Sequence, residues 1–188
     1  MLFLCYNFVG KLPNFTNVFT KVARESMKRS EKIKKKTGTF KEIHKMVKIL
    51  FVCHGNICRS PMAEFVLKDM VKKAGLSDKF LIRSVATSTE ELGNPVYPPA
   101  KREMNRHGVA CDGHRARQIT QADLDGNDYV FYMDSNNARN LRRMFPGQNK
   151  WQPFLSRDVA DPWYTGDFTQ TWQDIVEGCQ RILEEHNG

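Results

Sequence analysis

The feature that most limits the possible folds is a regular alternation of short apolar runs and helix-like segments from Val47 onward. Four runs rich in apolar and β-branched residues suit strands: 47–52, 80–87, 128–133 and 151–155. Between them, apolar residues recur at the spacing of one helix face. Strands that alternate with helices favour a parallel sheet with helices packed on both faces. The sequence therefore predicts an α/β domain built on such a sheet.

Four segments have the spacing and the end signals of helices. Ser60 followed by Pro61 predicts a helix start with Ser60 as the N-cap, and Gly75 predicts its end. Ser135 is the predicted N-cap of a later helix that ends near residue 145. The other helices are expected to run from the loop at 93–99 to about residue 107 and from 168 to 186, with residues 158–166 forming a loop.

The first predicted strand runs directly into a loop of polar and reactive residues, Cys53-His54-Gly55-Asn56-Ile57-Cys58-Arg59. In an open parallel sheet, ligands bind beyond the carboxyl ends of the strands. The loop leads into a predicted helix, whose first N–H groups and dipole attract anions. Gly55 and Asn56 are residue types that tolerate the positive φ such a turn needs. The loop therefore predicts a phosphate-binding site.

Within this loop, Cys53 and Arg59 form a pair suited to phosphoryl transfer. A thiol that faces a helix N-terminus and an arginine ionises more easily, and the thiolate is the nucleophile. The planar guanidinium of Arg59 can hold two phosphoryl oxygens. Ser60 can donate a hydrogen bond to the thiolate. We expect Cys53 to attack phosphorus while Arg59 stabilises the charge on the phosphoryl group.

A general acid is needed to protonate the oxygen that leaves phosphorus, and Asp161 is the best candidate. Pro162 restricts the backbone of Asp161. Trp163 and Tyr164 can form the wall of a slot for an aromatic leaving group. Taken alone, this segment would be an ordinary turn with exposed aromatic residues; together with the cysteine loop, it predicts an active site.

The charge distribution argues against a nucleic-acid-binding protein. The chain has a formal net charge of +8, but residues 1–45 hold 11 Lys and Arg against 3 Asp and Glu, whereas residues 46–188 hold 18 of each class. The excess therefore belongs to a basic tail, and no nucleic-acid partner is expected.

Residues 1–45 are expected to be a basic, disordered extension, and residues 46–188 the folded domain. One alternative is that the native protein starts at Met46. Another is that the extension tethers the domain to acidic partners or anionic lipid.

The cysteine count and the hydropathy predict a cytoplasmic protein. The five cysteines are an odd number without the spacing of a secreted disulfide framework, which favours a reducing compartment. The apolar start lacks the charged region and cleavage site of a signal peptide, and no stretch reaches the length of a membrane span.

From Val47 to the C-terminus, the chain resembles the low-molecular-weight protein tyrosine phosphatases, and looks most like their bacterial-type members. The matching segments are VCHGNICRSPMAE (52–64), SVATSTEELGNPVYPPA (84–100), HRARQIT (114–120), YMDSNN (132–137) and DPWYTGDF (161–168). The resemblance implies a four-stranded parallel twisted sheet with helices on both faces and the phosphate-binding loop after the first strand. It also implies hydrolysis of protein phosphotyrosine and small aryl phosphates through a phosphocysteine intermediate, with no metal or other cofactor, by a monomer or weakly self-associating enzyme.

Carried over by position, the resemblance makes Cys53 the nucleophile, Arg59 the phosphate clamp and Asp161 the general acid. It implies that Cys58 forms a reversible disulfide with the nucleophile, which protects the nucleophile from over-oxidation. Four residues match positions that brace the phosphate-binding loop: Asn56, Ser60, Ser84 and His114. Two segments depart from the family pattern, the acidic run Ser88-Thr89-Glu90-Glu91 and Trp163 in place of tyrosine, and both concern the pocket rim.

Other functions on the same loop remain open. A thioredoxin-coupled arsenate reductase would need a closely spaced further cysteine pair, whereas Cys111 and Cys179 are far apart in sequence. A protein-arginine phosphatase is associated with Thr where this chain has Ile57. A non-catalytic phosphate-binding module would need neither Cys53 nor Asp161. A metal site at Cys53, His54 and Cys58 fits no common zinc spacing, and Arg59 would repel the ion.

Overall fold

The computed structural model describes residues 46–186. Residues 1–45, for which a basic disordered extension is predicted, lie outside the described residues. Four strands form one sheet: β1 (Val47–Cys53), β2 (Phe80–Ala86), β3 (Tyr129–Tyr132) and β4 (Trp151–Pro153). The strand order is β2-β1-β3-β4, and every neighbouring pair is parallel. The predicted four-stranded parallel sheet is therefore confirmed.

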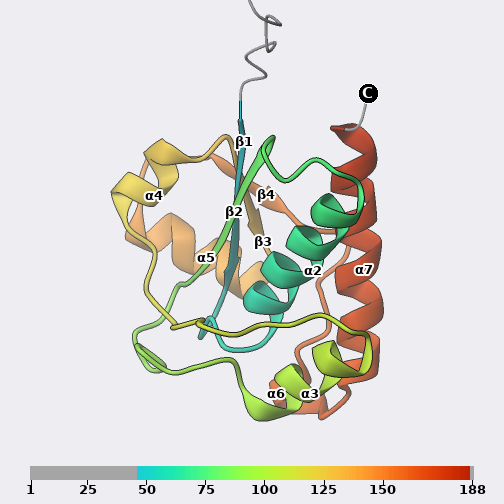
Figure 1. Cartoon of the computed structure of the whole chain (residues 1–188). Coiled ribbons are helices and arrows are strands. Elements are labelled where there is room, and N and C mark those ends of the chain that lie inside the picture. The colour runs from blue at the N-terminus through green and yellow to red at the C-terminus, as the bar shows by residue number, and fades with distance from the viewer. Residues whose placement is uncertain (1–45, 187–188) are drawn as a thin grey trace, which may run out of the picture. The chain divides into compact units, whose positions relative to one another are not determined.

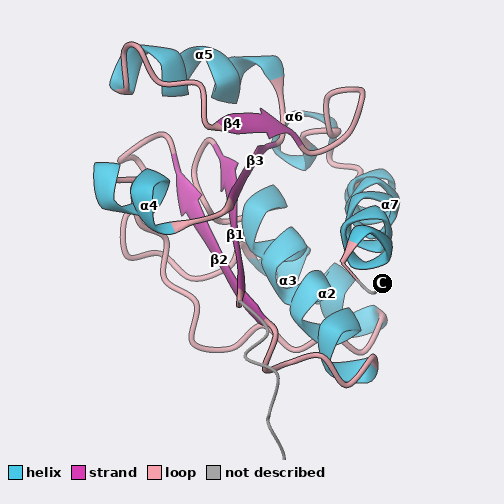
Figure 2. Cartoon of the chain, turned by 90° about the horizontal axis from the view of Figure 1, so that it is seen from above, coloured by secondary structure: helices cyan, strands magenta, loops and turns pink. Residues whose placement is uncertain are grey.

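Helices cover both faces of this sheet, as predicted (Figures 1 and 2). One face carries α2 (Arg59–Lys73), α3 (Pro98–Arg106) and α7 (Phe168–Glu185), and the other carries α4 (Gln121–Gly126) and α5 (Ser135–Met144). Alternate residues of β1 point to opposite faces. Ile49 and Phe51 accordingly join the core under α2 and α7, whereas Leu50 and Val52 join the core under α4 and α5.

Three local predictions are corrected by the structure. Helix α2 begins at Arg59 with Cys58 at the N-cap position, and the Ser60 hydroxyl contacts Cys53 instead of capping the helix. Helix α5 is capped by Asp134 and not by Ser135, because the Asp134 carboxylate accepts a hydrogen bond from Asn137 N at 2.7 Å. The predicted loop at 158–166 contains a short helix, α6 (Pro162–Thr165), which Asp161 caps.

Helix α4 was not predicted, although the sequence carries its start signal. Thr120 and Asp123 form a reciprocal capping box, in which each side chain accepts a hydrogen bond from the backbone N–H of the other residue. The helix has only six residues, and a single buried leucine, Leu124, anchors it to the sheet. A helix this short has too few apolar residues to produce a visible period.

Replacing Gly178 with Ala is expected to destabilise the domain by about 2 kcal/mol, because overpacking a core costs more than the helix gains from alanine. A Cβ at Gly178 in α7 would lie 2.2 Å from Cζ of Phe154, and Phe154 is fully buried against Phe51 and Phe131. Urea unfolding measures the change. Gly126→Ala is the matched control, since nothing lies within 4 Å of a Cβ there; equal stability of both variants would contradict the prediction.

Candidate active site

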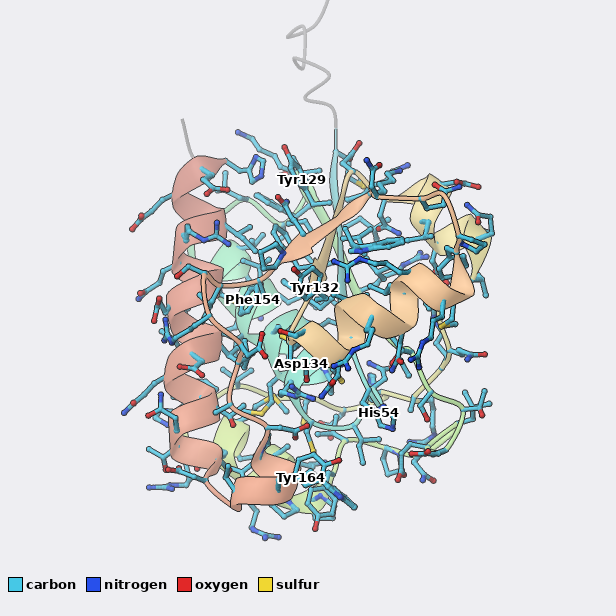
Figure 3. The ribbon with its side chains drawn as sticks, turned by 180° about the vertical axis from the view of Figure 1, so that it is seen from behind. His54, Tyr129, Tyr132, Asp134, Phe154 and Tyr164 are labelled. Atoms are coloured by element: carbon cyan, nitrogen blue, oxygen red, sulfur yellow. The ribbon has the colours of Figure 1, made fainter. Side chains whose placement is uncertain are left out.

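The predicted site residues meet at the carboxyl ends of β1 and β3. His54 follows β1, Asp134 follows β3 and Tyr164 lies in α6, and Figure 3 shows all three at the same end of the sheet. One pocket opens there. Its lining comprises Cys53, His54, Gly55, Ile57, Cys58, Arg59, Glu90, Glu91, Asp134, Asn136, Asn137, Asp161, Trp163 and Tyr164.

The phosphate-binding loop turns at Asn56, the only described residue other than glycine with a positive φ, +56°. The left-handed region is accessible to asparagine at low cost. Gly55, for which a positive φ was also expected, does not adopt one. Its hydrogen atom instead leaves room for Glu91, whose Cγ would lie 3.1 Å from a Cβ at Gly55.

The buried Asn56 side chain joins the loop to the rest of the domain. Its Nδ2 donates to the hydroxyls of Ser60 and Ser84, each at 2.9 Å, and its Oδ1 accepts from Arg117 N at 3.2 Å. His114 Nε2 lies 2.7 Å from the Asn56 carbonyl oxygen, so this nitrogen carries the proton and donates. Asn56, Ser60, Ser84 and His114, the residues predicted to brace the loop, therefore lie in one hydrogen-bonded network.

Glu64 completes this network and was not predicted as part of it. Ser84 Oγ donates to Glu64 Oε2 at 2.5 Å, and the other Glu64 oxygen pairs with Lys68. Since Ser84 accepts from Asn56 and donates to Glu64, the loop is anchored to both β2 and α2.

Cys53 lies at the floor of the loop, buried at the end of β1. Its Sγ accepts a hydrogen bond from Asn56 N at 3.3 Å and lies 3.0 Å from Ser60 Oγ. Ser60 Oγ already accepts from Asn56, and its only other acceptor within reach is Val85 O at 3.4 Å, so its proton is best placed on the sulfur. Two hydrogen-bond donors therefore lie against the Cys53 sulfur.

Arg59 is 2% exposed and faces two carboxylates across the pocket. Its Nη1 donates to Asp134 Oδ2 and its Nη2 to Asp161 Oδ2, both at 2.5 Å. Burial acts to lower the pKa of Arg59, but the charges of Cys53, Asp161 and Asp134 outweigh it and the pKa is raised. The guanidinium therefore stays charged, and its orientation is fixed by two partners.

Asp134 is the main residue that sequence reasoning missed. It lies inside the matching segment YMDSNN and directly follows a predicted strand, which was the available signal. In the structure it caps α5 with Oδ1 and orients Arg59 with Oδ2.

Asp161 reaches the pocket from the opposite side. Its Oδ1 accepts from Trp163 N at 3.1 Å and its Oδ2 accepts from Arg59. Trp163, 55% exposed, lies against the ring of Tyr97 with centroids 5.3 Å apart, and Tyr164 is 85% exposed. Both aromatic residues line the pocket.

The wall across from these aromatic residues is acidic. His54 Nε2 lies 2.9 Å from Glu90 Oε2, and both side chains are largely exposed. Glu91 packs beside Gly55. The predicted acidic departure from the family pattern therefore lies at the pocket itself.

Cys58 lines the pocket next to the nucleophile and is a free thiol. Burial raises the pKa of Cys58, and the charges of Cys53 and Asp161 raise it further, so this thiol stays protonated near neutral pH. Cys111 and Cys179 are buried free thiols in the core.

Residues 46–186 contain neither a metal-site cluster nor a helix suited to span a membrane. No cluster of three or more His, Cys, Asp or Glu in this part of the chain has the arrangement of a metal site. Among the helices described, none combines the length and the apolar character needed to cross a membrane.

Comparison with known proteins identifies the family to which the chain is similar. The family model described as low molecular weight phosphotyrosine protein phosphatase matches residues 48–187. A low molecular weight protein-tyrosine-phosphatase of Bacillus subtilis, YfkJ, is 39% identical over 147 residues, which cover 73% of this chain and 94% of the relative.

Solved structures agree as well. A low molecular weight protein tyrosine phosphatase from Streptococcus pyogenes is 43% identical, with a TM-score of 0.70 over 74% of this chain and 93% of that chain. The arginine phosphatase of Drosophila is 30% identical, with a TM-score of 0.68 over 76% of this chain and 99% of that chain. With its loop, its sheet and this extent of similarity, the chain belongs to the low molecular weight phosphotyrosine protein phosphatase family, as a bacterial-type member.

Proposed function

We propose that this protein hydrolyses protein phosphotyrosine and small aryl phosphates through a phosphocysteine intermediate. The observation that carries the proposal is the convergence of Cys53, Arg59 and Asp161 on one pocket, with Arg59 Nη2 donating to the Asp161 carboxylate at 2.5 Å. A nucleophile, an anion clamp and an acid thus surround one point.

In the first step, the Cys53 thiolate attacks phosphorus and the bond between phosphorus and the phenolic oxygen breaks. Arg59 and the backbone N–H groups of the loop hold the phosphoryl oxygens as charge shifts among them. Asp161 donates a proton to the leaving phenolic oxygen.

In the second step, water attacks the phosphocysteine and the phosphorus–sulfur bond breaks. Asp161, now a carboxylate, accepts a proton from that water, and inorganic phosphate leaves. The Ser60 hydroxyl, 3.0 Å from Cys53 Sγ, stabilises the thiolate as the leaving group. The residues named here suffice for both steps.

Trp163 and Tyr164 support an aromatic substrate, because an aryl ring can pack against them while its phosphate reaches the loop. Phosphotyrosine-containing proteins are the substrates we propose. The five cysteines of the chain lack the spacing of a secreted disulfide framework, and we therefore propose a reducing compartment such as the cytoplasm.

The similarity to the Drosophila arginine phosphatase makes phosphoarginine the competing substrate. The branched Ile57 side chain lines the pocket at the loop position where that activity is associated with threonine. We therefore favour phosphotyrosine. An arsenate reductase needs relay thiols that can react, but within residues 46–186 the two cysteines outside the loop, Cys111 and Cys179, are buried and burial raises the pKa of each.

A panel of matched peptides that contain phosphotyrosine, phosphoserine or phosphoarginine tests this assignment. Release of inorganic phosphate from the phosphotyrosine peptide should exceed release from the other two by at least about 100-fold in kcat/KM, because the slot and the acid suit an aryl leaving group. Faster hydrolysis of the phosphoarginine peptide would overturn the assignment.

Cys58 is proposed to protect the nucleophile during oxidation. Peroxide converts the Cys53 thiolate to a sulfenic acid, and attack by the Cys58 sulfur then forms a disulfide with loss of water. Since the pKa of Cys58 is raised, its thiolate fraction grows about tenfold per pH unit below that pKa. Disulfide formation should therefore accelerate from pH 7 to pH 9.

Cys58→Ser should accordingly keep kcat/KM within about twofold but lose most of the activity that dithiothreitol restores after peroxide treatment. Mass spectrometry of the Cys53 peptide would show sulfinic acid in the variant and disulfide in the unmodified protein. Cys111→Ala is the control, because Cys111 lies outside the pocket. Equal recovery in Cys58→Ser and the unmodified protein would contradict this role.

A further inference from the structure

Two side chains of helix α7 hydrogen-bond to the backbone of Ala160, the residue that precedes the proposed general acid Asp161. The backbone N–H of Ala160 donates to Asp174 Oδ2 at 3.0 Å, and the carbonyl oxygen of Ala160 accepts from Thr171 Oγ1 at 2.9 Å. Asp174 and Thr171 lie one helical turn apart and are 2% and 0% exposed. The N–H and the C=O of the residue next to Asp161 are therefore both fixed by buried side chains.

The other oxygen of Asp174 fixes the same loop at a second point. Asp174 Oδ1 accepts from Arg157 Nη2 at 2.9 Å and from Gln170 Nε2 at 3.0 Å. Arg157 also pairs with Glu177 on the next turn of α7. The loop is thus tied to the helix at Arg157 and at Ala160, three residues apart.

Between these ties, the loop is attached to the sheet. Val159 N donates to Met133 O at 2.8 Å, just beyond the end of β3, and Val159 O accepts from Arg59 Nη1 at 3.4 Å. Residues 157–161 are therefore held between α7 on one side and the end of β3 on the other. Asp161 has little freedom to move away from Arg59.

A contribution to stability alone does not explain why a carboxylate occupies the buried position of Asp174. A buried carboxylate loses its hydration, and an apolar side chain of similar volume would pack at this place without that cost. Every hydrogen bond that Asp174 accepts through its side chain, apart from the one from Gln170 on its own helix, comes from the loop that carries the acid.

We propose that Asp174 and Thr171 are positioning residues that hold Asp161 where it can protonate the leaving oxygen. The inference rests on the proposed function, because it concerns the same reaction. Misplacing a catalytic group by about 1 Å can cost about 100-fold in rate. Neither residue lines the pocket, so neither is assigned a contact with the substrate.

The test compares two substrates that differ in how much they need the acid. The phenol released from para-nitrophenyl phosphate leaves readily without a proton, whereas the phenol released from phenyl phosphate does not. A misplaced acid therefore lowers kcat/KM more for phenyl phosphate. A loss of folded protein, or a general loosening of the site, lowers both values by the same factor.

Asp174→Asn and Thr171→Val keep the shape of each side chain. Each should lower kcat/KM for phenyl phosphate about tenfold more than kcat/KM for para-nitrophenyl phosphate. This effect is smaller than the full contribution of general acid catalysis, because the acid is displaced and not removed. Thr171→Ser, which keeps the hydroxyl, should restore the ratio of the unmodified protein. Thr169→Val is the matched control, since Thr169 is exposed on the same helix and both values should stay unchanged.

Asp161→Asn separates failure of this inference from failure of the proposed function. In one outcome, Asp161→Asn changes the ratio of the two kcat/KM values, whereas Asp174→Asn and Thr171→Val lower both values by the same factor. The positioning role is then overturned, and the assignment of Asp161 as the acid stands. If Asp161→Asn leaves the ratio unchanged, the acid assignment falls, and the positioning role falls with it. For a variant that folds poorly, the ratio of the two kcat/KM values still reports on the acid, because it does not depend on the fraction of folded protein.

Discussion

Replacing Cys53 with Ser should lower kcat for aryl phosphates by at least about 10⁴-fold, because removing a catalytic nucleophile leaves only the contribution of binding and charge stabilisation. A serine hydroxyl is far less acidic than a thiol, and in the first step Asp161 acts as the acid, so it does not take up the proton of the serine. The groups around position 53 are Asn56 N and Ser60 Oγ, which are placed to donate hydrogen bonds and not to remove a proton.

Binding should survive this substitution. Arg59 and Asp134 make no hydrogen bond to the sulfur, and the loop keeps the contacts of Asn56 with Ser60, Ser84 and Arg117. A phosphotyrosine peptide should therefore bind Cys53→Ser within about tenfold of its affinity for the unmodified protein. Steady-state assays with para-nitrophenyl phosphate and calorimetric titration with the peptide measure the two effects. Near-normal turnover would exclude the phosphocysteine route.

The neighbouring cysteine supplies the control for this experiment. Cys58 lies in the same loop and lines the same pocket, but its raised pKa keeps it a neutral thiol. Cys58→Ser should therefore retain turnover. Loss of turnover in both variants would mean that the loop, and not the nucleophile, had been damaged.

The fold was predictable because its signals are local and repeated. Strand β1 alternates between two buried faces, so Ile49 to Val52 form a continuous apolar run that identifies a strand covered on both sides. The parallel order followed from helices between the strands. Helix α4 was not predicted because its single buried leucine gives no helical periodicity, although Thr120 and Asp123 carry the sequence signal of a capping box.

The proposed catalytic residues could be selected from the sequence where their chemistry and their spacing point to the same site. Cys53 and Arg59 are joined by a short loop, so their proximity is a local property. Asp161 is distant in sequence and was assigned from its Pro-aromatic context and from the family resemblance. The structure brings its carboxylate within hydrogen-bonding distance of Arg59.

The missed residues act through tertiary contacts that spacing does not reveal. Asp134 and Glu64 lie 75 and 20 residues from their partners Arg59 and Ser84. In the sequence, Asp134 stands next to the predicted N-cap Ser135, and Glu64 lies near the first turn of a predicted helix. Only the packing of β3 and α2 around the loop shows that both carboxylates orient it.

Arg59→Lys is expected to lower kcat/KM for aryl phosphates by about 10³-fold, the scale of losing oriented donors at a developing charge. The substitution keeps one positive charge. It removes the planar fork that presents two nitrogens at fixed spacing, which a lysine ammonium does not reproduce. In the structure the two nitrogens serve different carboxylates, Nη1 to Asp134 and Nη2 to Asp161.

A lysine at this position would pair with one of these carboxylates and leave the other without its partner in a largely buried pocket. The inhibition constant of inorganic phosphate should therefore rise by more than about tenfold, because fewer donors hold the anion and an uncompensated negative charge opposes it. Arg102→Lys, at an exposed position on α3, is the matched control and should change neither constant. An unchanged inhibition constant in Arg59→Lys would show that charge alone, without the fork, holds the phosphoryl group.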